Sequence, residues 1–217
     1  METIFNIFLA VHVAGGAVSL LSGAAAMIAA KGKRVHRQAG SVYYWAMAAV
    51  CASALVLSVL HPKQFLFYVA IFSFYLCFTG KRILRMKSLG TKATMQDWCG
   101  LGLAGVAGIA MLVRGGMSLA RGVSFGWVSV VFGALCLGLS LLDAQRFRTA
   151  PTERMHWFFT HLTRMIGGYI ATFTAFCVVN VHFLPALAVW LLPTAIGTVG
   201  IAGWTAHYRR KFRAVAR

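Results

Sequence analysis

The chain has 217 residues, of which 59% are hydrophobic and only 12% are charged. Because about a quarter of the residues in a soluble domain are charged, this composition excludes a soluble domain, a disordered tail and a nucleic-acid-binding module. The net charge of +17 comes from 21 Lys and Arg against four Asp and Glu. These basic residues lie in short runs between apolar segments, a pattern typical of membrane topology.

Seven apolar segments approach or exceed the roughly 20 residues that a helix needs to cross a bilayer. We therefore expect an all-α, polytopic membrane helix bundle in which residues 1–217 form a single transmembrane domain. The expected helices cover residues 4–30, 40–60, 64–81, 97–113, 123–143, 156–180 and 185–206. The third segment is the shortest and the fourth is rich in glycine, so six helices is the alternative count.

The basic residues fall almost entirely in alternate connections. Seventeen Lys and Arg follow the first, third, fifth and seventh segments, whereas Lys63, Arg114 and Arg121 lie on the other side. Since retained loops carry an excess of Lys and Arg, we expect the N-terminus outside and the C-terminus in the cytoplasm, in a bacterial inner membrane. The expected partners are the lipid bilayer and anionic lipid at the basic cytoplasmic loops, and no nucleic acid is expected.

The sixth segment carries an arginine within the predicted span. Arg164 lies about 12 Å from the start of this segment at helical rise, and it shares a helix face with His161. A charged group inside a membrane usually faces the bundle interior with a partner. We therefore expect Arg164 to point inward, with Asp97 or Asp143 as the available acidic partner.

Six polar residues are expected to lie at similar depth near the cytoplasmic side. They are His36, Arg37, Asp97, Asp143, His161 and Arg164. We interpret them as a site that binds a small anion, a proton or a lipid headgroup in a carrier or sensor role. The arginine would supply fixed charge, the histidines would titrate near neutral pH, and a carboxylate would balance the arginine.

Three other interpretations stay open, and none of them identifies a cofactor from the sequence. A metal-dependent enzyme would use His36, His161, Asp97 and Asp143, whose nitrogen and oxygen donors suit zinc, although paired-histidine spacing is absent. A haem-dependent enzyme would add His12, which has no second histidine at its depth. A structural membrane protein would need only a buried Arg–Asp pair that locks the bundle.

Two short motifs occur together in this chain. The first is His36-Arg37-Gln38-Ala39-Gly40, an HR-x-x-G element after the first helix, and the second is His161-Leu162-Thr163-Arg164-Met165, a late H-x-x-R-M element. This combination resembles a family of uncharacterised bacterial multi-pass membrane proteins, a domain-of-unknown-function group. The resemblance implies no particular activity. It points to His36, Arg37, Gly40, His161, Arg164 and Met165 as functional positions.

Overall fold

The computed structural model describes residues 2–149 and 151–215, with side chains through residue 213. Its elements are α1 Glu2–Ile28, α2 Arg34–Leu60, α3 Gln64–Arg82, the 3-10 turn η1 Ile83–Arg85, α4 Met95–Ala120, α5 Gly126–Arg148, α6 His156–Asn180 and α7 Ala186–Val215. All seven α-helices are long and apolar enough to cross a membrane. The predicted all-α architecture with seven helices is thereby confirmed, and the seven helices are compatible with a multi-pass membrane protein.

Several helices extend beyond the apolar segments that predicted them. α2 begins at Arg34 rather than near residue 40, α4 continues to Ala120 rather than 113, and α7 continues to Val215 rather than 206. Apolar content marks only the part of a helix that lipid surrounds. The backbone hydrogen bonds continue into the headgroup region, where Lys and Arg side chains reach water. As a result, the HR-x-x-G element lies in the first two turns of α2 and not in a loop.

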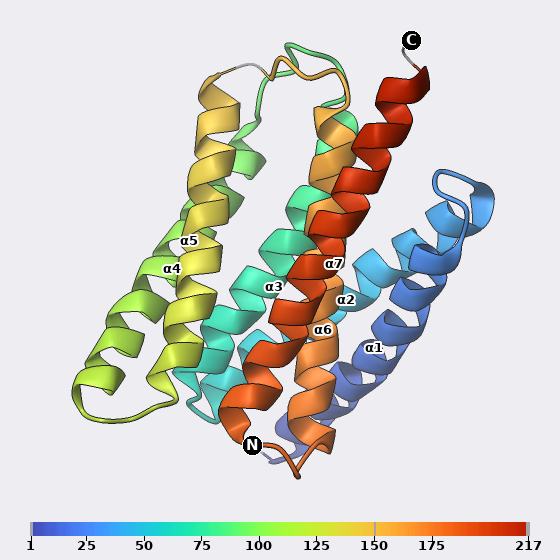
Figure 1. Ribbon diagram of the computed structural model, residues 1–217. Coiled ribbons are helices and arrows are strands. Elements are labelled where there is room, and N and C mark those ends of the chain that lie inside the picture. Colours follow the sequence, from blue (N-terminus) through green and yellow to red (C-terminus); the bar gives the residue numbers. More distant parts are fainter. Residues whose placement is uncertain (1, 150, 216–217) are drawn as a thin grey trace.

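α3 is the central helix of the bundle. It contacts α2, α4, α5 and α6, and half of its membrane span is buried, compared with 6% for α1. Figure 1 shows the α1–α2 and α4–α5 hairpins on opposite sides of α3 and α6, with α7 against α6. Two of its aromatic side chains, Phe72 and Tyr75, are buried at this position, and its other aromatic side chains are half-buried.

Glycines hold the α4–α5 hairpin at backbone contact. A Cβ atom added at Gly108 would lie 3.1 Å from the carbonyl oxygen of Gly133, and one added at Gly133 would lie 2.9 Å from that of Gly108. Gly115 and Gly126 form a second reciprocal pair, with corresponding distances of 2.9 and 2.6 Å. Small residues that let backbones approach closely are the usual basis of helix association in lipid.

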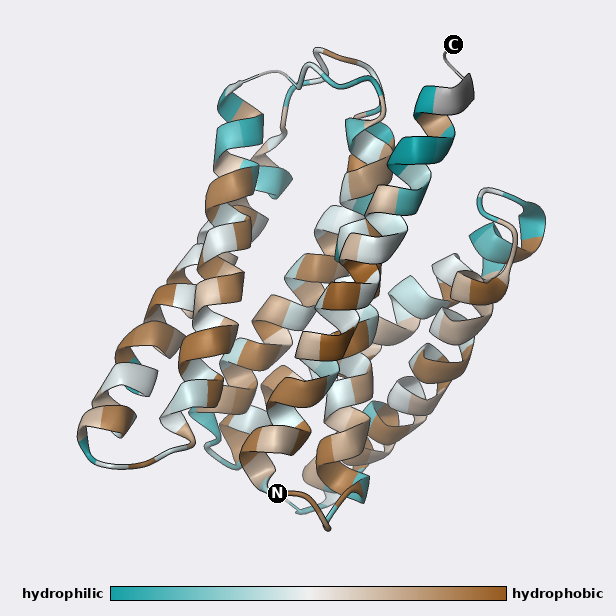
Figure 2. Ribbon diagram, in the orientation of Figure 1, coloured by the Kyte–Doolittle hydropathy of each residue, from teal (hydrophilic) through white to brown (hydrophobic). Residues whose placement is uncertain are grey.

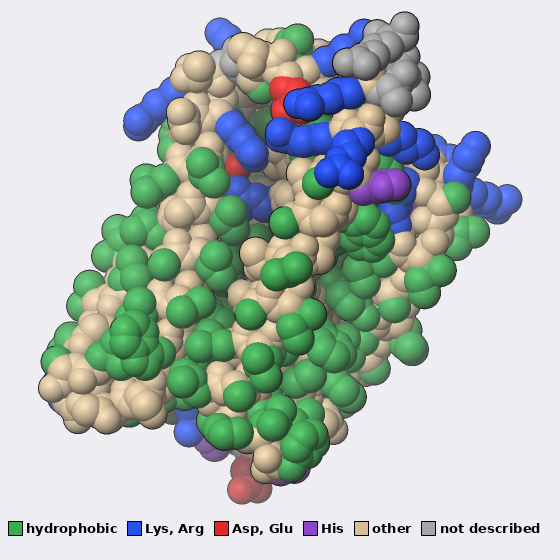
Figure 3. All heavy atoms as spheres, viewed as in Figure 1, with side chains coloured by type: hydrophobic (Ala, Val, Ile, Leu, Met, Phe, Trp, Pro, Cys, Tyr) green, Lys and Arg blue, Asp and Glu red, His purple; other side chains and the backbone are tan. Residues whose placement is uncertain are grey.

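Lys and Arg gather at one end of the bundle, which we call the cationic end. Successive helices run antiparallel, so their connections alternate between the two ends of the bundle. The cationic end holds residues 29–33, 83–94, 149 and 151–155 and the end of α7. Figure 2 shows hydrophilic residues concentrated there, and Figure 3 shows blue Lys and Arg side chains over the same end. Arg217, one of the seventeen basic residues expected on this side, lies outside the described residues.

Candidate functional site

The centre of the site is Arg164 on α6. This residue is only 2% exposed, as expected for an arginine that faces the bundle interior. Its Nη2 lies 2.8 Å from Oδ2 of Asp143 on α5, and it donates a hydrogen bond to the carbonyl oxygen of Leu139 at 3.0 Å. Of the two carboxylates expected as partners, Asp143 is therefore the one that pairs with Arg164.

Two further side chains complete the surroundings of Asp143. The Tyr75 hydroxyl donates to Oδ2 of Asp143 at 2.5 Å, and the Arg164 guanidinium lies over the Tyr75 ring, 5.5 Å from its centroid. Arg146 approaches Oδ1 of Asp143 at 3.4 Å. Sequence reasoning missed Tyr75 because an aromatic residue in an aromatic-rich helix resembles core. The signal that could have found it is the hydroxyl, which needs a partner when it is buried.

Arg164 keeps hydrogen-bonding capacity that the protein does not use. Its Nη1 is buried and has no hydrogen-bond partner among residues 2–149 and 151–215. A guanidinium presents five N–H donors, and leaving a buried donor without an acceptor costs roughly 1–3 kcal/mol. The cluster is thus incompletely satisfied, and a buried polar group without a partner is uncommon in native structures.

Asp97 belongs to a different and fully satisfied pair. It accepts Nε and Nη2 of Arg82 at 2.8 and 2.7 Å, and it also accepts the backbone N–H and hydroxyl of Thr94. Thr94 and Asp97 form a capping box at the start of α4, which satisfies otherwise free N–H groups. Arg82 entered the sequence analysis only as a topological charge. The three-residue spacing of Thr94 and Asp97 was the signal for the cap.

A cavity of about 480 Å³ lies at the cationic end, between the two ion pairs. Its walls come from α3, the connection 83–94 and the adjoining ends of α4, α5 and α6. The charged lining residues are Arg82, Lys92, Asp97, Asp143, Arg146 and Arg148. Both carboxylates are already paired with arginines. The lining therefore carries an excess of positive charge, and apolar walls focus the resulting potential.

The first turn of α6 contributes to the same cavity. His156 lines the cavity, and its Nε2 is buried without a hydrogen-bond partner in the described part of the chain. No side chain caps the N-terminus of α6, so this helix end presents partial positive charge. The helix end favours an occupant that carries negative charge, and Nε2 of His156 is available to form a hydrogen bond with this occupant.

His36 and His161 form a separate contact. Their ring centroids are 6.3 Å apart and the rings are close to perpendicular. Nδ1 of His36 lies 2.8 Å from the carbonyl oxygen of Ala26, and Nδ1 of His161 lies 2.7 Å from that of Gly80. Because a carbonyl oxygen only accepts, each Nδ1 must carry a proton, and Nε2 is the acceptor in the neutral ring. Neither histidine is among the lining residues of the cavity.

The remaining predicted residues lie apart from these contacts. Arg37 is exposed on the first turn of α2, and Nδ1 of His12 faces the Val50 carbonyl oxygen at 3.1 Å and the Ser53 hydroxyl at 3.3 Å. Within residues 2–149 and 151–215, no three His, Cys, Asp or Glu side chains are grouped to hold a metal ion.

The six predicted site residues are thus distributed over three contacts and one exposed position. Arg164 pairs with Asp143, Asp97 pairs with Arg82, and the two histidines face each other. Equal depth along parallel helices does not determine which helix face a residue occupies. Depth alone therefore could not show that these residues separate.

Comparisons of the chain with protein-family models, with curated proteins and with solved structures found no match. The family resemblance of the two motifs therefore stays an expectation. Function has to be inferred from the geometry of the cationic end.

Proposed function

We propose that this membrane protein binds a small oxyanion, with a phosphate or carboxylate group, in the cavity at its cationic end, in a carrier or sensor role. The observation that carries the proposal is the composition of the lining. Arg146, Arg148 and Lys92 face a cavity whose two carboxylates are already paired with arginines. Hydrogen bonds between such cations and an oxyanion are about twice as strong as neutral ones.

The residues around the cavity would have distinct roles. Arg146 is 42% exposed, and its contact with Asp143 is long at 3.4 Å. Its guanidinium can therefore turn from the carboxylate to a ligand and bind it with two parallel hydrogen bonds. His156 would donate from Nε2 in the tautomer that carries its proton on this nitrogen. Arg164 would hold the charge of Asp143, which otherwise would repel an anion at the same wall.

We propose that the cationic end faces the cytoplasm of a bacterium and that the N-terminus is outside. The support is the excess of Lys and Arg at this end. The test is labelling of intact cells with an impermeant maleimide, in a background without the five native cysteines. Lys63→Cys should be labelled and Lys33→Cys should not. The reverse pattern would contradict this orientation.

The binding proposal is tested on purified protein with inorganic phosphate, sulfate and succinate, each compared with chloride at equal ionic strength. We expect at least one oxyanion to raise the unfolding temperature and to give a saturable calorimetric signal. The Arg146→Gln/Arg148→Gln variant should lose this signal. The matched control is Arg114→Gln/Arg121→Gln, which removes the same charge from two exposed residues at the opposite end.

A second arm separates a free oxyanion from a lipid headgroup that bears the same phosphate chemistry. Protein in phosphatidylcholine nanodiscs is compared with protein in nanodiscs that also contain phosphatidic acid. Stabilisation by phosphate in the first system indicates a free oxyanion, whereas stabilisation only by phosphatidic acid indicates a headgroup. If no oxyanion shifts the wild type more than chloride does, or if the control variant loses the effect equally, the proposal is wrong.

Binding of a metal ion by His36 and His161 is a second candidate function. It is favoured because both Nδ1 atoms are held by carbonyl oxygens, an arrangement that fixes metal-binding histidines with Nε2 available. Zinc or copper should bind the wild type and not His36→Ala. The matched control is His61→Ala, which changes an exposed histidine at the opposite end. Equal binding by both variants would remove this candidate.

A further inference from the structure

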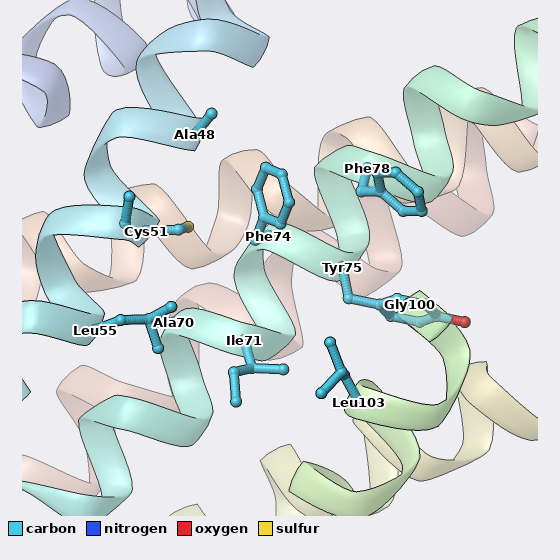
Figure 4. A pocket seen from close by; sticks show the side chains of 11 residues that line it. Ala48, Cys51, Leu55, Ala70, Ile71, Phe74, Tyr75, Phe78, Gly100 and Leu103 are labelled. Carbon is cyan, nitrogen blue, oxygen red and sulfur yellow. The ribbon is translucent and has the colours of Figure 1, made fainter. Parts of the chain in front are cut away.

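An apolar groove of about 310 Å³ runs along α3, between α2 and α4 (Figure 4). α2 and α4 both pack against α3, but they do not contact each other in the described part of the chain. They are therefore the two walls of the groove, and α3 is its floor. The lining residues are Ala48, Cys51, Ala52, Leu55, Ala70, Ile71, Phe74, Tyr75, Phe78, Gly100 and Leu103.

Small residues give this groove its width. Ala48 and Ala52 face it from α2, and Gly100 faces it from α4. A Cβ atom at Gly100 would lie 3.1 Å from the Phe78 ring, so even one methyl group would narrow this wall. Leu103 is 63% exposed and Ala52 is also exposed. The groove is therefore open to the surrounding lipid.

The groove offers an occupant almost no polar group. Tyr75 presents its ring to the groove, and Figure 4 shows the side chain extending toward α4. Its hydroxyl donates to Asp143 on α5 and is therefore already engaged. The remaining lining side chains are aliphatic, aromatic or thiol groups, so the groove suits a hydrocarbon chain.

Two basic residues, Lys81 and Arg85, lie near the groove at the cationic end. Lys81 Nζ is 5.7 Å from the ring centroid of Tyr44 on α2, and the Tyr44 ring is 6.3 Å from that of Phe74, which lines the groove. Arg85 follows one turn later and is exposed. Neither Lys81 nor Arg85 forms an ion pair with a residue that the structure describes.

We infer that the groove binds an acyl chain of an anionic phospholipid whose headgroup contacts Lys81 and Arg85. The apolar floor and walls match the chain, and the two cations match the phosphate. Cations near a membrane surface attract anionic lipid, but scattered charge alone would not select a position. The groove beside these cations supplies that position.

The test is native mass spectrometry of the protein released from nanodiscs that contain equal amounts of phosphatidylglycerol and phosphatidylcholine. We expect the wild type to retain phosphatidylglycerol preferentially. Ala48→Phe/Ala52→Phe fills the groove and should reduce the retained phosphatidylglycerol several-fold. The control is Ala10→Phe, which adds the same side chain at an exposed position of α1.

A second variant tests the headgroup contact without changing the groove. Lys81→Gln/Arg85→Gln should reduce the preference for phosphatidylglycerol by about fivefold for each cation removed. Its matched control is Lys63→Gln/Arg114→Gln, which removes two charges at the opposite end. Lys81 and Arg85 are not among the lining residues of the oxyanion cavity. The Lys81→Gln/Arg85→Gln variant should therefore still be stabilised by inorganic phosphate, so this inference and the proposed oxyanion site fail separately.

Three results would overturn the inference. The first is equal retention of the two lipids by the wild type, and the second is unchanged retention in Ala48→Phe/Ala52→Phe. The third is a dimer peak of the wild type that disappears in this variant, because the groove would then be occupied by a second copy of the chain.

Discussion

Among the residues that the structure describes, the Arg82–Asp97 and Arg164–Asp143 pairs differ in how completely their hydrogen bonds are satisfied. In the Arg82–Asp97 pair, two guanidinium nitrogens meet two carboxylate oxygens, and Thr94 adds two further bonds. In the Arg164–Asp143 pair, only Nη2 meets the carboxylate, and Nη1 is left without a partner among the described residues. The Arg82 side chain is 14% exposed, whereas that of Arg164 is 3% exposed.

Hydrogen bonding therefore distinguishes the two pairs more clearly than exposure does. The satisfied pair ties the end of α3 to the start of α4 and also caps α4. The incompletely satisfied pair is more buried and leaves a charged donor without a partner among the described residues, at a cost in free energy. Four substitutions test this comparison, from the largest expected effect to the smallest.

Asp143→Ala should have the largest effect. It leaves the Arg164 guanidinium buried without its counter-ion, and breaking a buried pair on one side costs about 3–5 kcal/mol. The free energy of unfolding in mixed micelles, followed by circular dichroism during a detergent titration, measures this loss. The control is Arg164→Met/Asp143→Leu, which removes both charges and should recover most of the stability. If the double variant is as unstable as the single one, the loss does not arise from an uncompensated charge.

Tyr75→Phe should have the next largest effect. It removes the hydroxyl that donates to Asp143 and keeps the ring that lies beside Arg164. Hydrogen bonds to charged groups contribute roughly 1.5–3 kcal/mol, and the same detergent titration should show a loss in this range. Tyr68→Phe removes a hydroxyl elsewhere on α3 and should change stability much less. Equal losses for the two variants would assign Tyr75 no special part in the cluster.

Asp97→Ala should cost less than either, although it removes more hydrogen bonds. Arg82 lies at the cationic end and can turn toward water, so the principal loss is the cap of α4, about 0.5–2 kcal/mol. Thr94→Ala removes the other half of the capping box and should cost a similar amount. A loss above that of Asp143→Ala would reverse the comparison between the two pairs.

Arg146→Gln should change stability least. Its contact with Asp143 is long and its side chain is 42% exposed, and exposed ion pairs contribute about 0–1 kcal/mol. The free energy of unfolding should therefore stay close to that of the wild type, while calorimetric binding of the oxyanion should weaken at least tenfold. A large loss of stability would show that Arg146 belongs to the structural part of the cluster.

The architecture could be predicted from the sequence because lipid imposes it on each segment separately. Every spanning segment must be apolar and helical whatever its neighbours are, so seven helices followed from length and composition. The inward position of Arg164 followed from the cost of placing a charge in hydrocarbon. Both inferences depend on one segment and the bilayer, and neither depends on tertiary contacts.

The arrangement of the site could not be predicted in the same way. His161 and Arg164 are only three residues apart on α6, yet His161 contacts Gly80 on α3 and Arg164 contacts Asp143 on α5. Which helix lies opposite each face depends on packing of the whole bundle. The parts that Tyr75 and His156 play could not be predicted for the same reason. The hydrogen bond from Tyr75 to Asp143 and the unpartnered Nε2 of His156 depend on the tertiary structure.

The reciprocal glycine contacts between α4 and α5 restrict how the protein can change shape. Each backbone sits where a side chain of the other helix would have to be, so the two helices cannot slide along each other without a steric clash. α4 supplies Asp97 and α5 supplies Asp143 and Arg146, all at the cationic end. If helix movement widens or narrows the cavity, α4 and α5 must therefore move together as one rigid unit relative to α3.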